Sequence, residues 1–234
     1  MLDQAFDALK KYDWGTDPKV LKPIDDAVVG AHGNAAARKD LETKLAAVLK
    51  SDAPRDAKDY TCRKLMLIGT ADSVPALAAL LSEKDNSHMA RYALERIPAP
   101  EAAQAMRDAL PKVGPELKVG IIASLGVRQD AASIPTLAAL LADADAAVAA
   151  AAAHALGDMR NAEAAKVLAS GKPATERAKL AATDASLSCA EALLAGGNKA
   201  EALVIYKGIV GQGNLPKHVR LAATRGMLAC AGKN

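Results

Sequence analysis

Leucine recurs at a fixed interval along this chain. Two nine-residue segments, SVPALAALL at residues 73–81 and SIPTLAALL at residues 133–141, are near copies, and a degenerate copy lies between them at residues 102–110. A second series, out of phase with the first, advances in three successive steps of 31 residues, at Leu94, Leu125, Leu156 and Leu187. Two interleaved series with one period indicate a repeated two-helix unit, which must stack on its neighbours to bury its apolar face.

The residues at the start of the two copies are typical of helix N-termini. Pro75 and Pro135 fall in the first turn, where the missing N–H of proline costs no hydrogen bond. Ser73 and Ser133 precede them, so we expect each serine to be an N-cap. Leucines at i, i+3 and i+4 then form one apolar stripe. The copies are therefore predicted to be the first helices of their repeats.

Glycine follows the apolar run of the second helix in two repeats. We expect Gly126 and Gly157 to be C-caps, because a left-handed residue commonly ends a helix there. No segment has the alternation or the β-branched clusters of a strand. The chain is predicted to be all-α, a right-handed α-α superhelix of about fourteen helices in seven antiparallel pairs. The expected spans are residues 2–12, 18–31, 35–50, 55–68, 72–82, 86–96, 100–110, 115–126, 131–142, 145–157, 162–170, 174–195, 198–211 and 216–231.

One segment resembles a known repeat family. Residues 145–158 read DAAVAAAAAHALGD, which is similar to the pattern D-x-x-V-R-x-x-A-x-x-A-L-G of HEAT-like repeats of the phycobilisome-lyase type. The arginine of that pattern is Ala149 here, whereas Lys118 takes the position in the preceding repeat and Arg220 restores it in the last helix. The resemblance covers residues 35–190 and implies a HEAT/ARM-like solenoid. It implies little about activity, because this repeat occurs in many unrelated proteins.

The C-terminal part departs from this pattern. Residues 197–203, followed by Tyr206, resemble the first helix of a tetratricopeptide repeat. We therefore expect an N-terminal helical cap at 1–34, HEAT-like repeats at 35–172, and C-terminal helical pairs at 173–234. Those last pairs are either tetratricopeptide-like or an atypical cap. All three parts are expected to form one continuous solenoid.

Three of the few aromatic residues lie in the expected N-terminal cap. Phe6, Tyr12 and Trp14 are expected to cover the exposed apolar face of the first repeat, as terminal repeats of a solenoid must be capped. The alternative for Trp14 is a role in stacking against a ligand.

Charge is unevenly distributed along the chain. The net charge is only +3, but residues 199–234 carry six Lys or Arg and one acidic residue, Glu201. This basic end either meets an acidic partner or is a solvated face. The three cysteines, Cys62, Cys189 and Cys230, are odd in number and widely spaced, which argues against a disulfide framework and favours buried thiols.

No stretch of the sequence has the about 20 apolar residues that a membrane-spanning helix needs. No signal peptide opens the chain, and the compartment is left open between the cytoplasm and export with a removed signal. No membrane partner is expected.

The sequence was searched for the chemistry of known helical-repeat enzymes. Di-iron hydroxylases built on HEAT repeats need His-Glu dipeptides, and none of the four histidines is followed by glutamate. Bilin lyases need a tetrapyrrole pocket, and DNA glycosylases need aromatic platforms in a basic groove, but only 3% of the residues are aromatic. Phosphate-binding glycine loops and nucleophile elbows are absent. We expect no catalytic residues, cofactor or metal.

The resemblance implies an interaction scaffold. The expected function is non-enzymatic binding of a protein or peptide partner, acidic in character or another segment of a larger parent chain, on the concave face formed by the second helices. The alternatives are a helical-repeat enzyme or small-molecule-binding protein, a nucleic-acid binder, and a structural spacer. The candidate binding residues are polar side chains left over on the second helices, namely Arg63, His88, Arg91, Lys118, His154 and Arg220.

Arg91 stands out among these candidates. It lies one turn before Leu94, where the other repeats have Ile122, Ala153 and Asp184. Its guanidinium could pair with a carboxylate of a partner. The alternative is an ion pair between repeats with an acidic residue such as Glu95 or Asp130.

Overall fold

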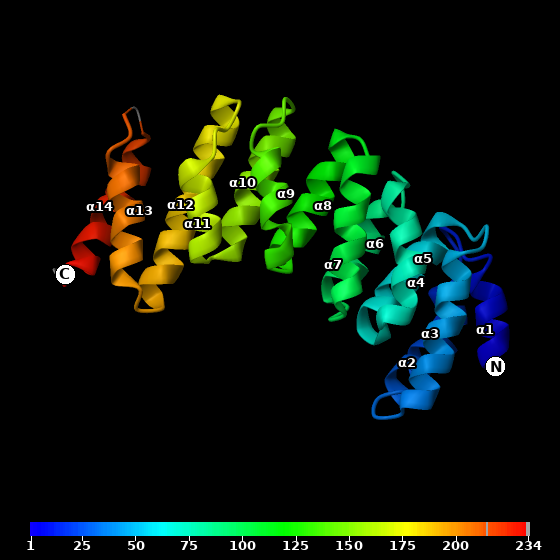
Figure 1. The fold of residues 1–234 in the computed structure, drawn as a ribbon. Helices are drawn as coiled ribbons and strands as arrows, with labels where there is room; N and C mark the ends of the chain where they lie inside the picture. Colours follow the sequence, from blue (N-terminus) through cyan, green and yellow to red (C-terminus); the bar gives the residue numbers. More distant parts are fainter. Residues whose placement is uncertain (214, 233–234) are drawn as a thin grey trace. The chain divides into compact units, whose positions relative to one another are not determined.

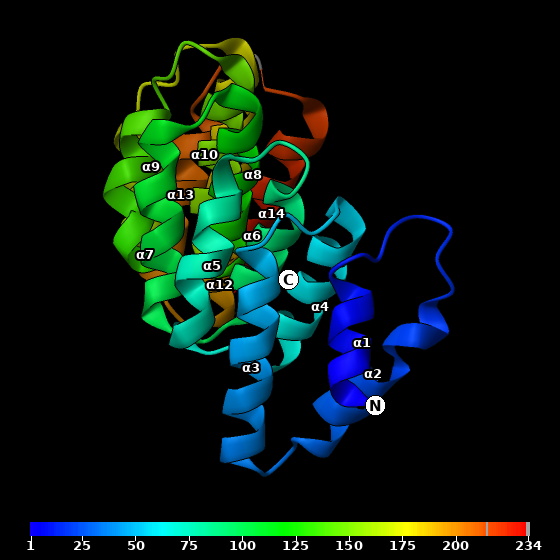
Figure 2. The same cartoon turned by 90° about the vertical axis from the view of Figure 1, so that its right-hand side faces the viewer.

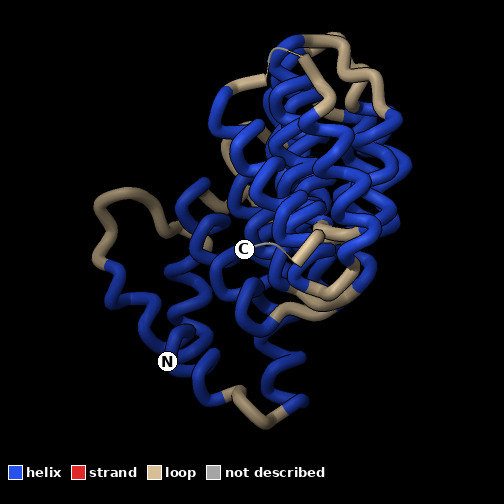
Figure 3. The backbone as a smooth tube through the Cα atoms, turned by 90° about the vertical axis from the view of Figure 1, so that its left-hand side faces the viewer, coloured by secondary structure: helices blue, strands red, loops and turns tan. Residues whose placement is uncertain are grey.

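The computed structural model describes residues 1–213 and 215–232, and these are entirely helical and loop, with no strand (Figure 3). The predicted all-α fold of fourteen helices is confirmed in this part of the chain. The α-helices are α1 (Leu2–Leu9), α2 (Lys22–Gly30), α3 (Ala35–Leu49), α4 (Arg55–Ile68), α5 (Val74–Ala79), α6 (Ser87–Arg96), α7 (Pro100–Ala109), α8 (Pro115–Val127), α9 (Ile134–Leu140), α10 (Ala146–Met159), α11 (Ala162–Ser170), α12 (Glu176–Ala195), α13 (Lys199–Val210) and α14 (Lys217–Cys230).

Five short 3-10 helices adjoin some of these helices. They are η1 (Pro18–Leu21), η2 (Ala71–Ser73), η3 (Leu80–Ser82), η4 (Leu110–Lys112) and η5 (Ala131–Ser133). None of the helices described is long and apolar enough to cross a membrane. Lys233 of the basic end, Asn214 and Asn234 lie outside the described residues.

The chain divides into two compact units, Met1–Ser124 and Leu125–Asn234, here called unit 1 and unit 2. In unit 1, α1 packs on α2, and the pairs α3/α4 and α5/α6 stack so that α4 contacts α6 and α5 contacts α7 (Figure 2). Successive repeats therefore have first helices beside first helices and second helices beside second helices. The predicted domain boundaries at residues 34 and 172 stay predictions.

Unit 2 follows the same scheme from α9 to α14 (Figure 1). Its second helices α10 and α12 pack along each other, and α12 also contacts α11, α13 and α14. The twenty-residue α12 is thus the central helix of this unit. Its buried face consists largely of alanines and Cys189, so the neighbouring helices can approach closely.

The starts of α5 and α9 differ from the prediction. Ser73 and Ser133 are not side-chain N-caps. Each serine is the last residue of a 3-10 turn that directly precedes the α-helix. Thr70 caps the first of these turns by accepting a hydrogen bond from the N–H of Asp72. The two prolines do lie in the first turn, as predicted.

The two glycines predicted to be C-caps lie inside their helices instead. Gly126 is in α8 and Gly157 is in α10, and neither residue has a positive φ. A Cβ at residue 126 would lie 2.9 Å from the Cα of Ala155, and a Cβ at residue 157 would lie 2.8 Å from the Cα of Ala185. These glycines therefore allow close helix contact, whereas α10 ends at Arg160, which adopts the left-handed conformation.

The N-terminal aromatic residues only partly form the expected cap. Phe6 is buried, and Tyr12 lies near Tyr60, with 6.4 Å between the ring centroids. Trp14 is 93% exposed, so the prediction that it covers the first repeat is wrong. The buried thiols of Cys62 and Cys189 agree with the prediction, and Cys230 is half-buried.

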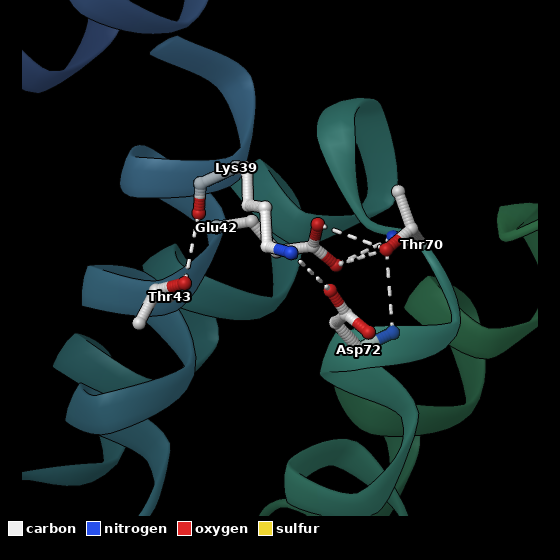
Figure 4. A network of polar contacts seen from close by, with 5 residues as sticks. All are labelled: Lys39, Glu42, Thr43, Thr70 and Asp72. Carbon is white, nitrogen blue, oxygen red and sulfur yellow. Dashed lines mark hydrogen bonds and ion pairs between the residues drawn. The ribbon is translucent and has the colours of Figure 1, made fainter. Parts of the chain in front are cut away.

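A turn in unit 1 is held by two side chains of α3, one turn of helix apart. The guanidinium of Arg38 donates to the carbonyls of Ile68 and Gly69 at the end of α4, at 2.7 and 3.3 Å. Glu42 accepts from the backbone N–H of Thr70 at 2.6 Å and from its hydroxyl at 3.0 Å (Figure 4). The backbone groups of the turn between α4 and α5 are thus hydrogen-bonded by side chains of α3, which fixes one repeat against the next.

Candidate functional site

The predicted binding residues all lie on second helices, but the structure does not gather them. Arg63 is on α4, His88 and Arg91 are on α6 and Lys118 is on α8 in unit 1, whereas unit 2 has His154 on α10 and Arg220 on α14. Only one pair of them is in contact. The Nη2 atom of Arg91 lies 3.3 Å from Nδ1 of His88.

Arg63 is paired within its own helix. Its guanidinium lies 3.2 Å from the carboxylate of Asp59, at i,i+4 spacing. Exposed ion pairs of this kind are weak, and Arg63 can exchange Asp59 for a carboxylate of a partner. The predicted role of Arg63 in partner binding therefore stays a prediction.

Arg91 is turned into the contact between α6 and α8. Its Nη1 donates to the carbonyl oxygen of Gly120 at 2.9 Å and to the hydroxyl of Ser124 at 3.0 Å. The same hydroxyl donates to Glu95 at 2.7 Å. A Cβ at residue 120 would lie 2.6 Å from the guanidinium carbon, so a side chain there would displace the guanidinium of Arg91 from this position.

The burial of Arg91 changes its pKa. Desolvation lowers the pKa of Arg91, and the nearby carboxylate of Glu95 opposes this by raising it. Through its hydrogen bonds to Gly120 and Ser124, the guanidinium connects α6 of one repeat to α8 of the next. This arrangement favours a role between repeats over capture of a partner, although the bonds run to Gly120 and Ser124 instead of directly to an acidic side chain.

Unit 2 contains an open groove that the sequence analysis did not identify. It has a volume of about 440 Å³ and lies between the first helices α11 and α13, with α12 at its floor. Leu168 and Ala169 line it from α11, and Val204, Ile205 and Gly208 line it from α13. A smaller hollow of about 190 Å³ shares Ala169, Val204 and Ile205 with it and extends the groove toward the N-terminal ends of both helices.

The groove exposes apolar side chains to solvent. Val204 is 70% exposed, although it lies on a helix whose opposite face is buried through Ala202, Tyr206 and Ile209. Gly208 lies on the groove side one turn after Val204, and a Cβ there would meet no heavy atom within 4 Å. Glycine inside a helix costs about 1 kcal/mol relative to alanine, and packing does not require it here. The missing side chain leaves the groove open.

The polar groups of the groove are few. Thr183 on α12 and Gln212 after α13 meet at its floor, with 3.3 Å between the hydroxyl and the amide oxygen. Lys179 lines the groove and pairs with Glu176 at 2.6 Å. Lys166 and Glu201 line the smaller hollow. These groups lie at the floor and the ends of the groove, and no nucleophile and base among them are in contact.

The groove could have been found from the sequence by reading α13 as a helix with two apolar faces. Residues 202, 206 and 209 form the buried stripe, while residues 204, 205 and 208 form a second stripe that a solvated helix would make polar. The candidate residues predicted from the sequence are all polar and lie on second helices, so they do not include this apolar stripe on a first helix.

One comparison with known proteins identifies a repeat family in this sequence. The family model of HEAT repeats matches residues 114–186. Among solved structures, human deoxyhypusine hydroxylase in complex with glycerol is similar, with a TM-score of 0.41 and 11% identity over 99% of this chain and 96% of that chain. That identity is too low to extend its activity to this chain. No curated protein matches. The match to the HEAT-repeat family is thus carried by residues 114–186.

Proposed function

We propose that this protein is a non-enzymatic interaction module that binds a segment of a partner protein in the groove between α11 and α13. The observation that carries the proposal is the open apolar groove itself, with Val204 exposed on its wall and Gly208 keeping it unfilled. Apolar surface of this kind is favourable to cover, at about 25 cal/mol per Å² removed from water.

The chemistry of the groove favours a protein segment over a small substrate. Its walls are aliphatic side chains of two parallel first helices, and its polar groups lie at the floor and the ends. Enzyme and cofactor sites instead gather precisely placed titratable groups in a deep pocket. Among residues 1–213 and 215–232, no three His, Cys, Asp or Glu side chains come together as metal ligands would.

The proposal shifts the predicted binding surface to the first helices of unit 2. The second-helix residues were chosen because they were polar and unassigned, yet Arg91 is engaged within unit 1 and Arg63 has a partner in its own helix. In the described part of unit 2, by contrast, Val204 on the groove wall stays exposed.

The test is a selection of peptides displayed on phage against the whole chain, repeated with Gly208→Leu. A leucine at residue 208 would fill open space and block the groove. Gly30→Leu is the matched control, because a Cβ at Gly30 also meets nothing within 4 Å but lies in unit 1, outside the groove. Peptides that bind the wild type and the control variant but do not bind the Gly208→Leu variant support the proposal. Failure to enrich any peptide, or equal binding to both variants, overturns it.

A further inference from the structure

The last helical pair of unit 2 has an uneven charge. Helices α13 and α14 carry five Lys or Arg, and Glu201 in the first turn of α13 is their one acidic residue. The basic residues are all exposed, and they are Lys199, Lys207, Lys217, Arg220 and Arg225. Among the described residues, no carboxylate lies within the 4.0 Å of an ion pair from any of these side chains. This pair contains most of the basic end that the sequence left open between an acidic partner and a solvated face.

Helix α14 carries apolar residues on two opposite sides. Val219, Ala223 and Gly226 form its buried side, which packs against α12 and α13. Successive residues of a helix are about 100° apart, so Leu221 and Leu228 lie about 160° and about 180° round the axis from Val219. Each of these two leucines is 48% exposed. Both therefore point away from α12 and α13, into solvent.

The side of α14 that carries these leucines is also positively charged. Lys217 lies one turn before Leu221, and Arg225 lies one turn after it. Lys217, Leu221, Arg225 and Leu228 thus follow one another at i, i+4, i+8 and i+11, with a basic residue before each leucine. We call these four residues the outer face of α14.

The nearby acidic residues do not neutralise this face. Asp184 and Glu191 are exposed on α12, but that helix lies on the buried side of α14, where its residues Ala190 and Leu193 belong to the same core cluster as Val219. The outer face of α14 therefore has a positive charge of its own, which attracts acidic groups from outside.

The combination of positive charge and apolar surface distinguishes the possible partners. A second copy of the same face would bring like charges together, which is unfavourable. The phosphates of a nucleic acid would pair with the basic residues but leave the leucines uncovered. Two half-exposed leucines offer little apolar area to insert into a membrane surface. An acidic protein helix with aliphatic residues on one side can cover the leucines and pair with the charges together.

We infer that the outer face of α14 is a second binding surface, which takes an acidic amphipathic helix of a partner protein. Aliphatic residues of that helix pack on Leu221 and Leu228, and its carboxylates pair with Lys217 and Arg225. The surface is separate from the groove between α11 and α13, because none of these four residues lines the groove. The inference thus goes beyond the proposed function, and Gly208→Leu is expected to leave binding to the outer face intact.

The test uses a displayed library of helical peptides of about 14 residues. One side of each peptide is drawn from Leu, Ile, Val and Met, and the flanking positions are drawn from Glu, Lys and Ser. Peptides are selected on the whole chain and depleted on a double variant, Leu221→Ser with Leu228→Ser. This variant keeps every charge, so the preferred sign of the flanks is measured and not imposed.

The expected result is a set of peptides that depend on the two leucines and are enriched in glutamate over lysine at the flanks. Leucine-dependent peptides with neutral or basic flanks would overturn the inference, and so would the absence of any leucine-dependent peptide. Neither of these outcomes affects the proposed function, because the groove is unaltered in the double variant.

One selected peptide then measures the contribution of single residues by fluorescence anisotropy. Arg225→Glu is expected to weaken binding about fivefold, and Leu221→Ser about threefold. Lys172→Glu and Leu180→Ser are the matched controls, because both residues are exposed in unit 2 outside α13 and α14, and Leu180 is 49% exposed. Circular dichroism melts confirm that each variant is folded. Equal effects of a variant and its matched control would contradict the inference.

Two other polyanions test the remaining classes of partner. Single-stranded DNA of about ten nucleotides and vesicles of phosphatidylcholine with phosphatidylserine are measured at about 0.15 M salt. Both are expected to bind more weakly than the selected peptide and to be insensitive to Leu221→Ser. Tighter binding of the DNA or of the vesicles would overturn the inference in favour of a nucleic acid or a membrane surface.

Discussion

The phenol ring of Tyr206 on α13 fills the space that a side chain at Gly226 on α14 would occupy. Tyr206 is 1% exposed and belongs to a cluster with Ala190, Leu193 and Val219 that closes the end of unit 2. Gly226 is thus required by packing, whereas Gly208, two residues after Tyr206, faces open space. Glycine is thus present on these neighbouring helices in two different settings, one crowded by an aromatic ring and one facing open space.

This contrast predicts opposite effects of alanine at the two positions. Gly226→Ala forces the ring of Tyr206 to move and should lower the stability of α13 and α14 by about 2 kcal/mol. Gly208→Ala adds helix propensity without a clash and should raise it by about 0.5–1 kcal/mol. Hydrogen exchange of the amides of the two helices measures both changes. Changes of the same sign would show that the packing around Tyr206 is described wrongly.

Glu42 offers a second test in unit 1, because the residue is 2% exposed and its carboxylate accepts the hydrogen bond of the Thr70 N–H. Glu42→Ala leaves that donor unpaired and should destabilise α3 to α5 by about 2 kcal/mol. Lys39→Ala is the matched control on the same helix. It removes only the exposed contact with Asp72 at 4.0 Å, and should change nothing measurable (Figure 4). Thermal melts and hydrogen exchange compare the two, and equal losses would argue against the turn contact.

Arg91 is expected to behave as a structural residue. Arg91→Lys keeps a positive charge but cannot reproduce both Nη1 hydrogen bonds to Gly120 and Ser124, so unit 1 should lose about 1–2 kcal/mol. Lys118→Ala, on the helix that Arg91 contacts, should leave stability unchanged. Chemical denaturation followed by circular dichroism gives both values. If Arg91→Lys is neutral and instead weakens peptide capture, the original prediction of a partner-binding arginine is right.

The thiols should differ in reactivity. Burial raises the pKa of Cys62 to about 12 and that of Cys189 to about 11, so both remain protonated and covered at pH 8. A disulfide reagent such as Ellman's should therefore label Cys230 in the native protein and all three cysteines in denaturant. Rapid native labelling of Cys62 or Cys189 would show that α4 or α12 opens readily.

Asp25 links α2 to α4 through Lys64 at 2.6 Å and the Tyr60 hydroxyl at 2.7 Å. Burial opposes ionisation of Asp25, but hydrogen bonds from Lys64 and Tyr60 outweigh it and lower its pKa below 3.8. A lowered folded pKa means that the stabilisation is complete above the unfolded pKa and is lost as the pH falls through the folded value. Melting temperatures of the wild type should fall on acidification below about pH 4. Asp25→Asn should lower the melting temperature at neutral pH and reduce its fall below about pH 4. Parallel pH profiles of the melting temperature for the two proteins would exclude a stabilising role of the Asp25 carboxylate.

The sequence predicted the helices well because their signals are local and repeat. The spans expected by extending the repeat pattern agree with the observed helices to within a few residues, and the prolines marked the first turns of α5 and α9. The roles of single residues depend on what packs against them. A glycine after Leu125 or Leu156 fits a C-cap and a close helix contact equally well by sequence, and only the positions of Ala155 and Ala185 decide between them.

The candidate site was harder to predict for the same reason. Arg91 looked like an orphan because Gly120 and Ser124, about one repeat away, were not recognised as its partners. The groove needs two facts that no local pattern contains, namely that α11 and α13 are neighbours and that the stripe of Val204 faces the gap between them.

The position of a bound peptide tests the central claim most directly. A selected peptide with a diazirine analogue of leucine at its central apolar position is cross-linked to the whole chain by light, and the adducts are mapped by mass spectrometry. We predict adducts within residues 162–171 of α11 and residues 201–212 of α13 and the turn after each helix, and their loss with Gly208→Leu. Adducts concentrated on the second helices, near His154 or Arg220, would contradict the account.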